Sequence, residues 1–213
     1  VKADKREPTT LAAYDQHVRL HIIPACGAMK LSQITAPKVQ AILDDWLLSL
    51  SRPMAVRLLR SFKAILTQAQ VRGHVAHNAA LAVKVRKLAR EAVKATPPSK
   101  AELRAILKAA EKGEAKPRAL VELAVFSGLR ASELRGLSWS SLDLKAGTVT
   151  VAQRADAKGI IGPPKSKAGF RTIPLPPRAI TALKAWKLAC PAHTLDLVFP
   201  SAKGKPLSHH VLL

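Results

Sequence analysis

The chain has 213 residues, with 35 Lys and Arg against 14 Asp and Glu, so its formal net charge is +21. Hydrophobic residues make up 48% of the chain, which is enough for a packed core and excludes a wholly disordered protein. The positive charge predicts a polyanionic partner, usually nucleic acid, and a basic protein of ribosomal type is the alternative on composition alone.

The sequence also bears on membrane segments, disulfides, metal sites and the start of the chain. The sequence holds no apolar window long enough to cross a membrane and no apolar signal segment near its start. Its two cysteines, Cys26 and Cys190, lie far apart, so we expect no disulfide and a reducing cytoplasm. The histidine pairs have no further ligands close by, so we expect no metal site. The first residue is not Met, which suggests that the chain begins inside a longer protein.

Residues 1–85 are predicted to form an all-α domain. Apolar residues recur at spacings of three and four, and this pattern predicts three amphipathic helices: 9–23, 36–50 and 53–72. Pro24 and Gly27 are expected to end the first of them, and a further short helix is expected near 78–83.

Basic residues lie off the apolar stripe of the third helix and continue after it. No acidic residue occurs between Asp45 and Glu91, which favours a phosphate-facing surface over an ordinary solvated helix face. Residues 86–98 are predicted to be a basic linker, because Pro97 and Pro98 prevent a helix from continuing. The residues expected to contact DNA here are Arg57, Arg60, Lys63, Lys84, Arg86 and Lys87.

Residues 99–213 are predicted to form an α+β domain. Ser99 and Glu102 have the spacing of a capping box, which predicts the start of a helix. The predicted elements after this helix are a buried helix over 118–127, a strand over 148–151, a glycine-rich hairpin over 159–169, a strand over 170–175, a helix over 177–190 and a short extended piece over 197–199. The fold class expected for the whole chain is mainly α with a small antiparallel sheet.

The stretch FSGLRASELRGLSW, residues 126–139, places an arginine between two helical patterns. Gly128 suits the left-handed conformation that ends a helix, so Arg130 would lie beside the start of the next one. A guanidinium in that position can donate two parallel hydrogen bonds to a phosphate. Glu133, three residues later, could hold the arginine in place, and an ordinary surface Arg–Glu pair is the alternative.

Three segments resemble motifs of one family. SGLRASELRGLSWSSLD (127–143) resembles the first catalytic-arginine box of the tyrosine recombinases, the phage integrase family. KSKAGFRTIPLP (165–176) is similar to the family's lysine-bearing β-hairpin, and LVFPSAKGKPLS (197–208) to the segment before its later motifs. Segments between residues 9 and 84 are similar to the family's core-binding domain.

The resemblance implies a site-specific recombinase of a phage or mobile element, which breaks and rejoins double-stranded DNA through a phosphotyrosyl intermediate. It implies that Arg130 stabilises charge on the phosphate and that Lys167 is a general acid toward the leaving 5′ oxygen. Lys165 is a rival for that role, and phosphate contact without chemistry is the other interpretation of both lysines. The family needs no metal or cofactor, and we expect a homotetramer on DNA and a place in the bacterial nucleoid.

The chain also departs from the family pattern. The family's second arginine motif, histidines and nucleophilic tyrosine are expected beyond Leu213, so the catalytic domain is expected to be truncated and inactive by itself. The only tyrosine is Tyr14, which matches a packing aromatic, and we expect it on the buried face of the first helix beside Leu11 and Val18. A noncatalytic DNA-binding protein on the same fold is the alternative function. An RNA-binding protein is disfavoured by the 4% aromatic content.

Overall fold

The structure, a computed structural model, describes residues 7–86, 96–208 and 210. The chain divides into two compact units, Val1–Lys94 (unit 1) and Ala95–Leu213 (unit 2). The predicted fold class is confirmed, because the described chain is mainly helical and has small antiparallel sheets in unit 2. The finer division into a core-binding domain, a linker and a truncated catalytic domain stays a prediction.

In the described part of the chain, no helix is long and apolar enough to cross a membrane. Cys26 in unit 1 and Cys190 in unit 2 are both free thiols.

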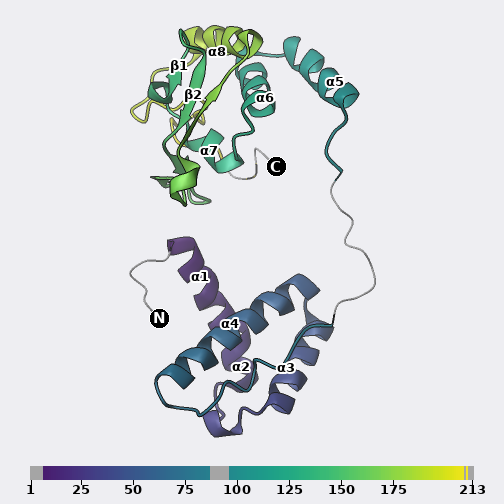
Figure 1. Cartoon of the computed structure of the whole chain (residues 1–213). Helices are drawn as coiled ribbons and strands as arrows, with labels where there is room; N and C mark the ends of the chain where they lie inside the picture. Colours follow the sequence, from purple (N-terminus) through teal and green to yellow (C-terminus); the bar gives the residue numbers. More distant parts are fainter. Residues whose placement is uncertain (1–6, 87–95, 209, 211–213) are drawn as a thin grey trace. The chain divides into compact units, whose positions relative to one another are not determined.

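The first helix of unit 1 does not end where the sequence predicted. α1 (Pro8–His17) continues through a π-helical turn, Val18–Ile22, into α2 (Ile23–Cys26), and Figure 1 shows them as one rod that crosses α4. The Ile23 N–H bonds five residues back, to Val18 O. Pro24 has no N–H to donate, and the wider turn lets the helix pass it instead of stopping. The prediction that Pro24 ends this helix was wrong, whereas the expected stop at Gly27 is confirmed, because α2 ends at Cys26, immediately before Gly27.

The two long helices of unit 1 match the predicted stripes. α3 (Ala36–Ser49) begins at Thr35, whose side chain accepts from the Lys38 N–H, and α4 (Arg52–Val71) follows after a short turn. Leu43 and Leu58 are fully buried between these helices, and each contributes about 1.5–3 kcal/mol by leaving water. Other members of this core are Val39, Ile42, Trp46, Ala55, Leu59, Phe62 and Leu66.

The short helix predicted near 78–83 is absent, and side chains hold turns there instead. The Asn78 amide donates to Lys63 O and to Thr67 Oγ1, both at 2.9 Å, and its own oxygen accepts the Ala80 N–H. Such local side-chain bonds compete with helical backbone bonds. The prediction of a helix was wrong, because the Asn78 side chain binds the Ala80 N–H and two acceptors on α4, and the segment forms turns.

Unit 2 opens with the predicted capped helix. α5 (Lys100–Glu111) begins at Ser99, where the Glu102 N–H donates to Ser99 Oγ and the Ser99 N–H donates to Glu102 Oε2 at 2.7 Å. α6 (Ala115–Ser127) and α8 (Pro177–Ala189) pack side by side (Figure 1).

The helix predicted to be buried over 118–127, which is α6, is buried only in part. Phe126 on α6 is 36% exposed, whereas Glu122 on the same helix is 1% exposed. A buried carboxylate needs a partner, and Arg178 of α8 donates three hydrogen bonds to Glu122. Part of the inward face of α6 is therefore an ion pair and not apolar packing.

The main sheet of unit 2 is antiparallel, in the order β1–β2–β5. Its strands are β1 (Leu142–Asp143), β2 (Thr148–Val151) and β5 (Arg171–Pro174), and Val149 pairs with both Leu142 and Ile173. A second, two-stranded sheet joins β3 (Arg154–Ala155) to β4 (Ile161–Gly162), partly inside the predicted hairpin loop.

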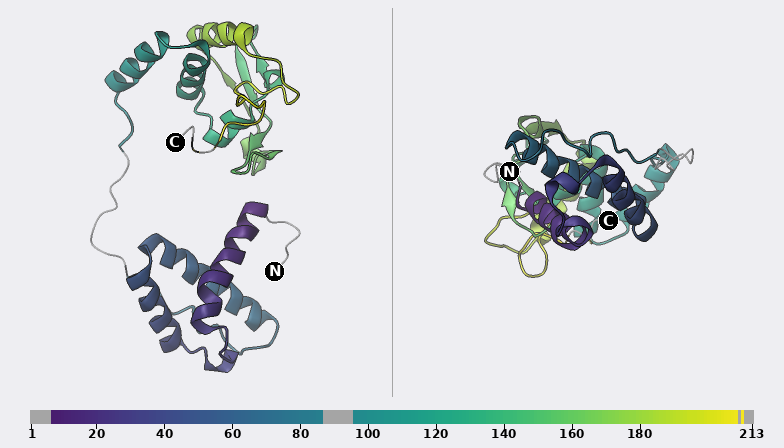
Figure 2. Two further views of the ribbon diagram at one scale, coloured as in Figure 1. Left: turned by 180° about the vertical axis from the view of Figure 1, so that it is seen from behind. Right: turned by 90° about the horizontal axis from the view of Figure 1, so that it is seen from below.

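The segment after α8 returns to α7 (Ala131–Gly136), as the yellow trace in Figure 2 shows. Val198 donates its N–H to Leu137 O at 2.8 Å, and the buried Arg135 donates from Nε to Leu207 O at 2.6 Å. These contacts fix α7, which follows Arg130, against the core of unit 2.

Candidate active site

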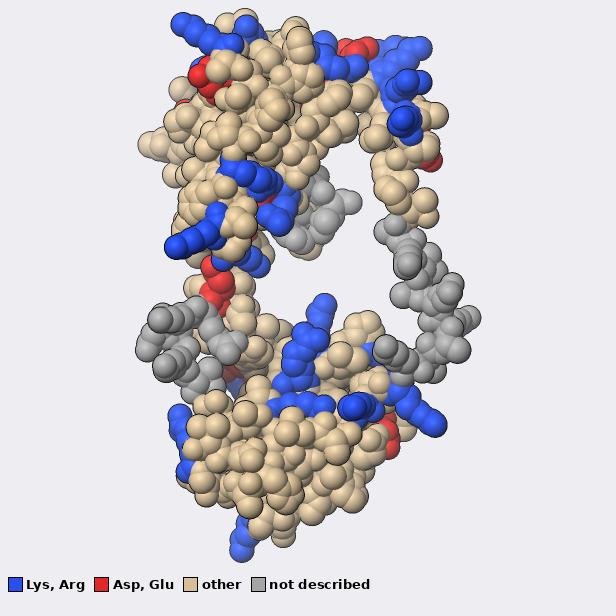
Figure 3. All heavy atoms as spheres, in the orientation of Figure 1, with Lys and Arg blue, Asp and Glu red and all other residues tan. Residues whose placement is uncertain are grey.

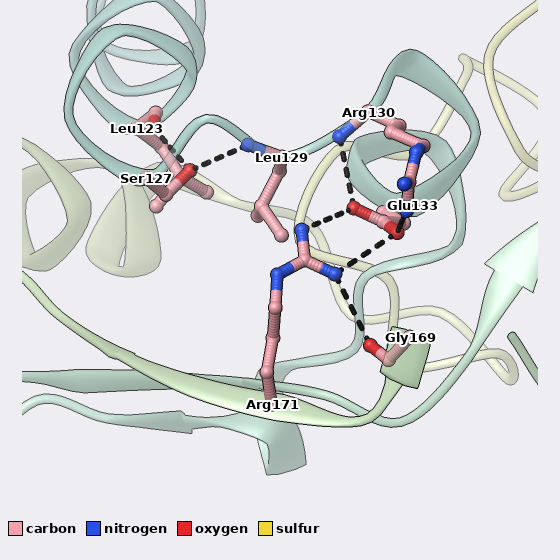
Figure 4. Close-up of polar contacts among 7 residues, drawn as sticks. All are labelled: Leu123, Ser127, Leu129, Arg130, Glu133, Gly169 and Arg171. Atoms are coloured by element: carbon pink, nitrogen blue, oxygen red, sulfur yellow. Dashed lines mark hydrogen bonds and ion pairs between the residues drawn. The ribbon is translucent and has the colours of Figure 1, made fainter. Parts of the chain in front are cut away.

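Arg130 occupies a sharp joint between α6 and α7. Gly128 ends α6 with φ of +60°, a left-handed conformation in which most other residues are strained. Ser127 Oγ donates to Leu123 O at 2.6 Å and accepts the Leu129 N–H at 3.3 Å (Figure 4). The predicted helix end at Gly128 is confirmed, and it places Arg130 immediately before α7.

Glu133 is the centre of the polar cluster in Figure 4. Its side chain is 3% exposed, and it accepts four hydrogen bonds. Arg130 donates one from its backbone N–H to Oε2 and one from Nη1 to Oε1, each at 2.9 Å. Arg171 donates the other two, from Nη1 to Oε1 at 3.2 Å and from Nη2 to Oε2 at 2.8 Å. Both carboxylate oxygens are therefore paired with a guanidinium.

These contacts keep Glu133 ionised. Burial raises the pKa of the carboxyl, but the hydrogen bonds from Arg171 and Arg130 outweigh it and lower the pKa from 4.5 to about 2. The same contact with Glu133 raises the pKa of Arg171. The cluster therefore keeps one negative and two positive charges across the physiological range.

The low pKa predicts an acid-sensitive fold of unit 2. Because folding lowers the pKa of Glu133, its contribution is complete above about pH 4.5 and is lost as the pH falls toward 2. Between pH 6 and pH 3, the wild type should lose about 2 kcal/mol more unfolding free energy than Glu133→Gln. Urea titration in a Trp46→Phe background measures this, because the remaining tryptophans lie in unit 2. Parallel pH profiles for the two proteins would contradict the prediction.

The Arg130 side chain is largely exposed to solvent. It is 72% exposed, although its partner Glu133 is buried. Of the five N–H groups of the guanidinium, one donates to Glu133. The carboxylate already takes the backbone N–H of Arg130 at the start of α7. One backbone N–H at the start of α7 is therefore already occupied, and anion binding by the exposed Arg130 guanidinium stays a prediction.

The two candidate lysines are both exposed and lie in the segment before β5. Lys167 begins a 3-10 turn, Lys167–Gly169, and its carbonyl accepts the Phe170 N–H at 3.1 Å. Lys165 lies two residues earlier, outside that turn. The choice between them stays a prediction, and the turn gives Lys167 the more constrained backbone.

Arg171 is a site residue that the sequence-based analysis did not single out. It belongs to β5, and its guanidinium joins Glu133 on α7 to Gly169 O, which accepts from Nη1 at 3.1 Å (Figure 4). The alternation of side chains along β5 could have indicated this role, because Arg171 lies on the same strand face as the half-buried Ile173. A charge on an inward face requires a partner.

The predicted DNA-contacting residues of unit 1 lie on α4 and on the segment after it. Arg60, Lys63 and Lys84 line a shallow hollow of about 310 Å³. Figure 3 shows Lys and Arg gathered along one edge of unit 1, whereas the rest of its visible surface is mainly uncharged. Arg57 and Arg86 are also exposed, and Lys87 lies outside the described residues.

Lys63 differs from its neighbours, because its ammonium group is already engaged. It donates to Leu81 O at 3.2 Å and to Val83 O at 2.6 Å, and so holds the turns after α4. At most one of its three N–H groups remains for a phosphate.

Tyr14 is less buried than expected. No residue of α1 is buried, and Tyr14, Leu11 and Val18 are all half-buried. Its ring lies edge-on to His17, whose Nδ1 is 2.8 Å from Ser61 Oγ on α4. The expected buried face is therefore only partly formed.

Two family models match this chain. The model described as the N-terminal SAM-like domain of phage integrases matches residues 1–47, and that of the phage integrase family matches residues 99–213, more than half of the chain. The chain belongs to the phage integrase family. The predicted relationship to the tyrosine recombinases is thereby confirmed.

A curated relative of this integrase-family chain is also an integrase. Prophage integrase IntR of Escherichia coli K12 is 42% identical over 100 residues, which are 47% of this chain and 24% of IntR. The chain thus spans about a quarter of the length of that relative.

Solved structures show the same fold. The Tn1549 transposon integrase, determined in complex with a circular intermediate DNA, has a TM-score of 0.82 and 18% identity, over 96% of this chain and 69% of that chain. A lambda integrase tetramer bound to a Holliday junction has a TM-score of 0.71 and 22% identity, over 97% and 58%.

Among the described residues, no group of three or more His, Cys, Asp and Glu side chains is arranged to hold a metal ion. The charged groups of the polar cluster are Arg130, Arg171 and Glu133, and the candidate residues Lys165 and Lys167 lie nearby in sequence.

Proposed function

We propose that this protein is a site-specific DNA recombinase that breaks and rejoins duplex DNA through a phosphotyrosyl intermediate. The observation that carries the proposal is the exposed Arg130 guanidinium, oriented by a buried carboxylate that Arg171 also neutralises. In a cleavage step of this kind, negative charge grows on the nonbridging phosphate oxygens. Arg130 would stabilise that charge without rearranging, because Glu133 already fixes the position of its guanidinium.

In the proposed step, a tyrosine hydroxyl loses its proton to solvent and its oxygen attacks phosphorus. The 3′-phosphotyrosyl bond forms while the bond from phosphorus to the 5′ oxygen breaks. Lys167 gives its proton to that leaving oxygen, and Lys165 is the rival donor. We propose that a tyrosine other than Tyr14 attacks, because the Tyr14 ring packs edge-on against His17, which itself contacts Ser61 on α4.

DNA is also the partner that we propose for the basic surface of unit 1, with Arg57, Arg60, Lys84 and Arg86 contacting phosphates. Several solved relatives were determined on DNA, among them the lambda integrase tetramer on a Holliday junction. We propose the same partner and a homotetramer for the complete protein, acting on the bacterial nucleoid in the cytoplasm.

The test uses the complete gene product and a nicked suicide duplex, on which a broken strand cannot be rejoined. We expect a covalent protein–DNA adduct on a denaturing gel, and Tyr14→Phe should still form it. Lys167→Ala should slow its formation by about 10²–10⁴-fold. A 5′-bridging phosphorothioate should restore most of the rate, because a sulfur leaving group needs no proton.

The other outcomes separate the alternatives. Rescue of Lys165→Ala, with Lys167→Ala unaffected, would assign the general acid to Lys165. Tight DNA binding by the wild type without any adduct would support a noncatalytic DNA-binding protein on the same fold. Loss of the adduct in Tyr14→Phe would show that the placement of the nucleophile is wrong.

A further inference from the structure

We propose that Arg171 is a positioning residue, which fixes the Lys167 turn and Arg130 relative to each other through Glu133. This inference rests on the proposed cleavage activity. Its basis is that one guanidinium, on β5, contacts both elements that carry the candidate catalytic side chains.

The first contact controls Arg130. Glu133 is 3% exposed, and Arg171 supplies two of its four hydrogen bonds. Without Arg171, the buried carboxylate would keep only Arg130 as its cationic partner. A buried charge with an unfilled acceptor draws in the nearest donor. Arg130 would then turn further toward Glu133, and its exposed N–H groups would be withdrawn from the phosphate.

The second contact controls the lysine. Arg171 Nη1 donates to Gly169 O, the last carbonyl of the turn that Lys167 begins. The turn is closed by the Gly169 N–H on Ser166 O at 2.9 Å and is packed tightly, since a Cβ on Gly169 would lie 2.5 Å from Pro164 Cβ. The end of this turn is therefore tied to Glu133 through one side chain.

A second arginine pair in unit 2 provides the matched control. Arg178 contacts the buried Glu122 with three hydrogen bonds and also pairs with the exposed Glu111. It resembles Arg171 in chemistry, but its acceptors lie on α5 and α6 and not on the Lys167 turn or at Arg130. Loss of Arg178 therefore reports the cost of breaking a buried ion pair by itself.

The experiment compares Arg171→Met with Arg178→Met in the complete gene product, on suicide duplexes with oxygen or sulfur at the 5′-bridging position. Arg171→Met should cleave the oxygen substrate about 10–100-fold more slowly than the wild type, as misplacement of reacting groups commonly does. Its sulfur-to-oxygen rate ratio should exceed that of the wild type by about tenfold, because the sulfur substrate does not need Lys167. Arg178→Met should keep the wild-type ratio. Arg171→Lys retains the positive charge but not the planar guanidinium with its two parallel donors. Its cleavage rate and its sulfur-to-oxygen rate ratio should therefore lie between those of Arg171→Met and the wild type.

Amide hydrogen exchange gives a readout that is independent of cleavage. The Gly169 and Phe170 amides should exchange faster in Arg171→Met and at the wild-type rate in Arg178→Met. If the wild type forms no adduct, the proposed function fails, and exchange alone decides whether Arg171 holds the turn.

Three results would overturn the inference. The first is cleavage by Arg171→Met at the wild-type rate. The second is slower cleavage by Arg171→Met while either its sulfur-to-oxygen rate ratio or the exchange rate of the Gly169 and Phe170 amides stays at the wild-type value. The third is a loss of DNA affinity as large as the loss of rate, which would make Arg171 a direct phosphate contact.

Discussion

Raising the salt concentration from 50 to 200 mM is expected to weaken DNA binding by this chain about 10³–10⁵-fold. The net charge is +21, and the basic residues of unit 1 are largely exposed. Binding through six to ten phosphates releases that many condensed counterions, so the logarithm of the binding constant falls steeply with the logarithm of salt. Fluorescence anisotropy on a labelled duplex measures the slope, and a flat dependence would exclude phosphate-driven binding.

Two single substitutions on the same face of α4 test which side chains contribute to this salt dependence. Arg60→Ala removes an exposed side chain and should reduce the salt slope by about one unit. Lys63→Ala should reduce it less, because the Lys63 ammonium already donates to Leu81 O and Val83 O. Lys63→Ala should instead lower the stability of unit 1. Equal slope changes in both variants would show that Lys63 gives up its carbonyl partners on DNA.

Arg130→Lys is expected to reduce cleavage about 10²–10³-fold in the complete gene product, the usual cost of removing one oxyanion donor. Lysine keeps the charge but cannot both pair with Glu133 and present a planar fork to the phosphate. DNA affinity should change little, because many other phosphate contacts remain. Single-turnover cleavage of the suicide duplex and anisotropy on the same DNA measure the two effects.

Arg178→Lys is the control for this substitution, because it changes an arginine of the same unit that pairs with buried Glu122. It should cleave DNA at close to the wild-type rate. Wild-type cleavage by Arg130→Lys would show that the Arg130–Glu133 pair is an ordinary surface ion pair. A parallel loss in both variants would attribute the effect to the stability of unit 2.

Some features were determined by the sequence alone, because they depend on residues close together in the chain. The Ser99–Glu102 capping box forms within one helical turn, and Gly128 ends α6 by its own conformational freedom. The alternation over Thr148–Val151 is sufficient to define a strand. The Arg130–Glu133 pair is likewise local, since residues three apart share a helix face.

Only the tertiary structure decided the contacts that join distant segments. Arg171 reaches Glu133 across 38 positions of sequence, and Lys63 reaches Val83 across 20. The helix predicted over 78–83 is replaced by turns because Asn78 finds acceptors on α4, and the first helix passes Pro24 through a π turn. A buried charge or an unpaired backbone group is costly whatever its position in sequence, so its partner is chosen by packing. Local spacing could place Arg130 at the joint, but it could not show that Arg171 pairs with the same carboxylate, Glu133.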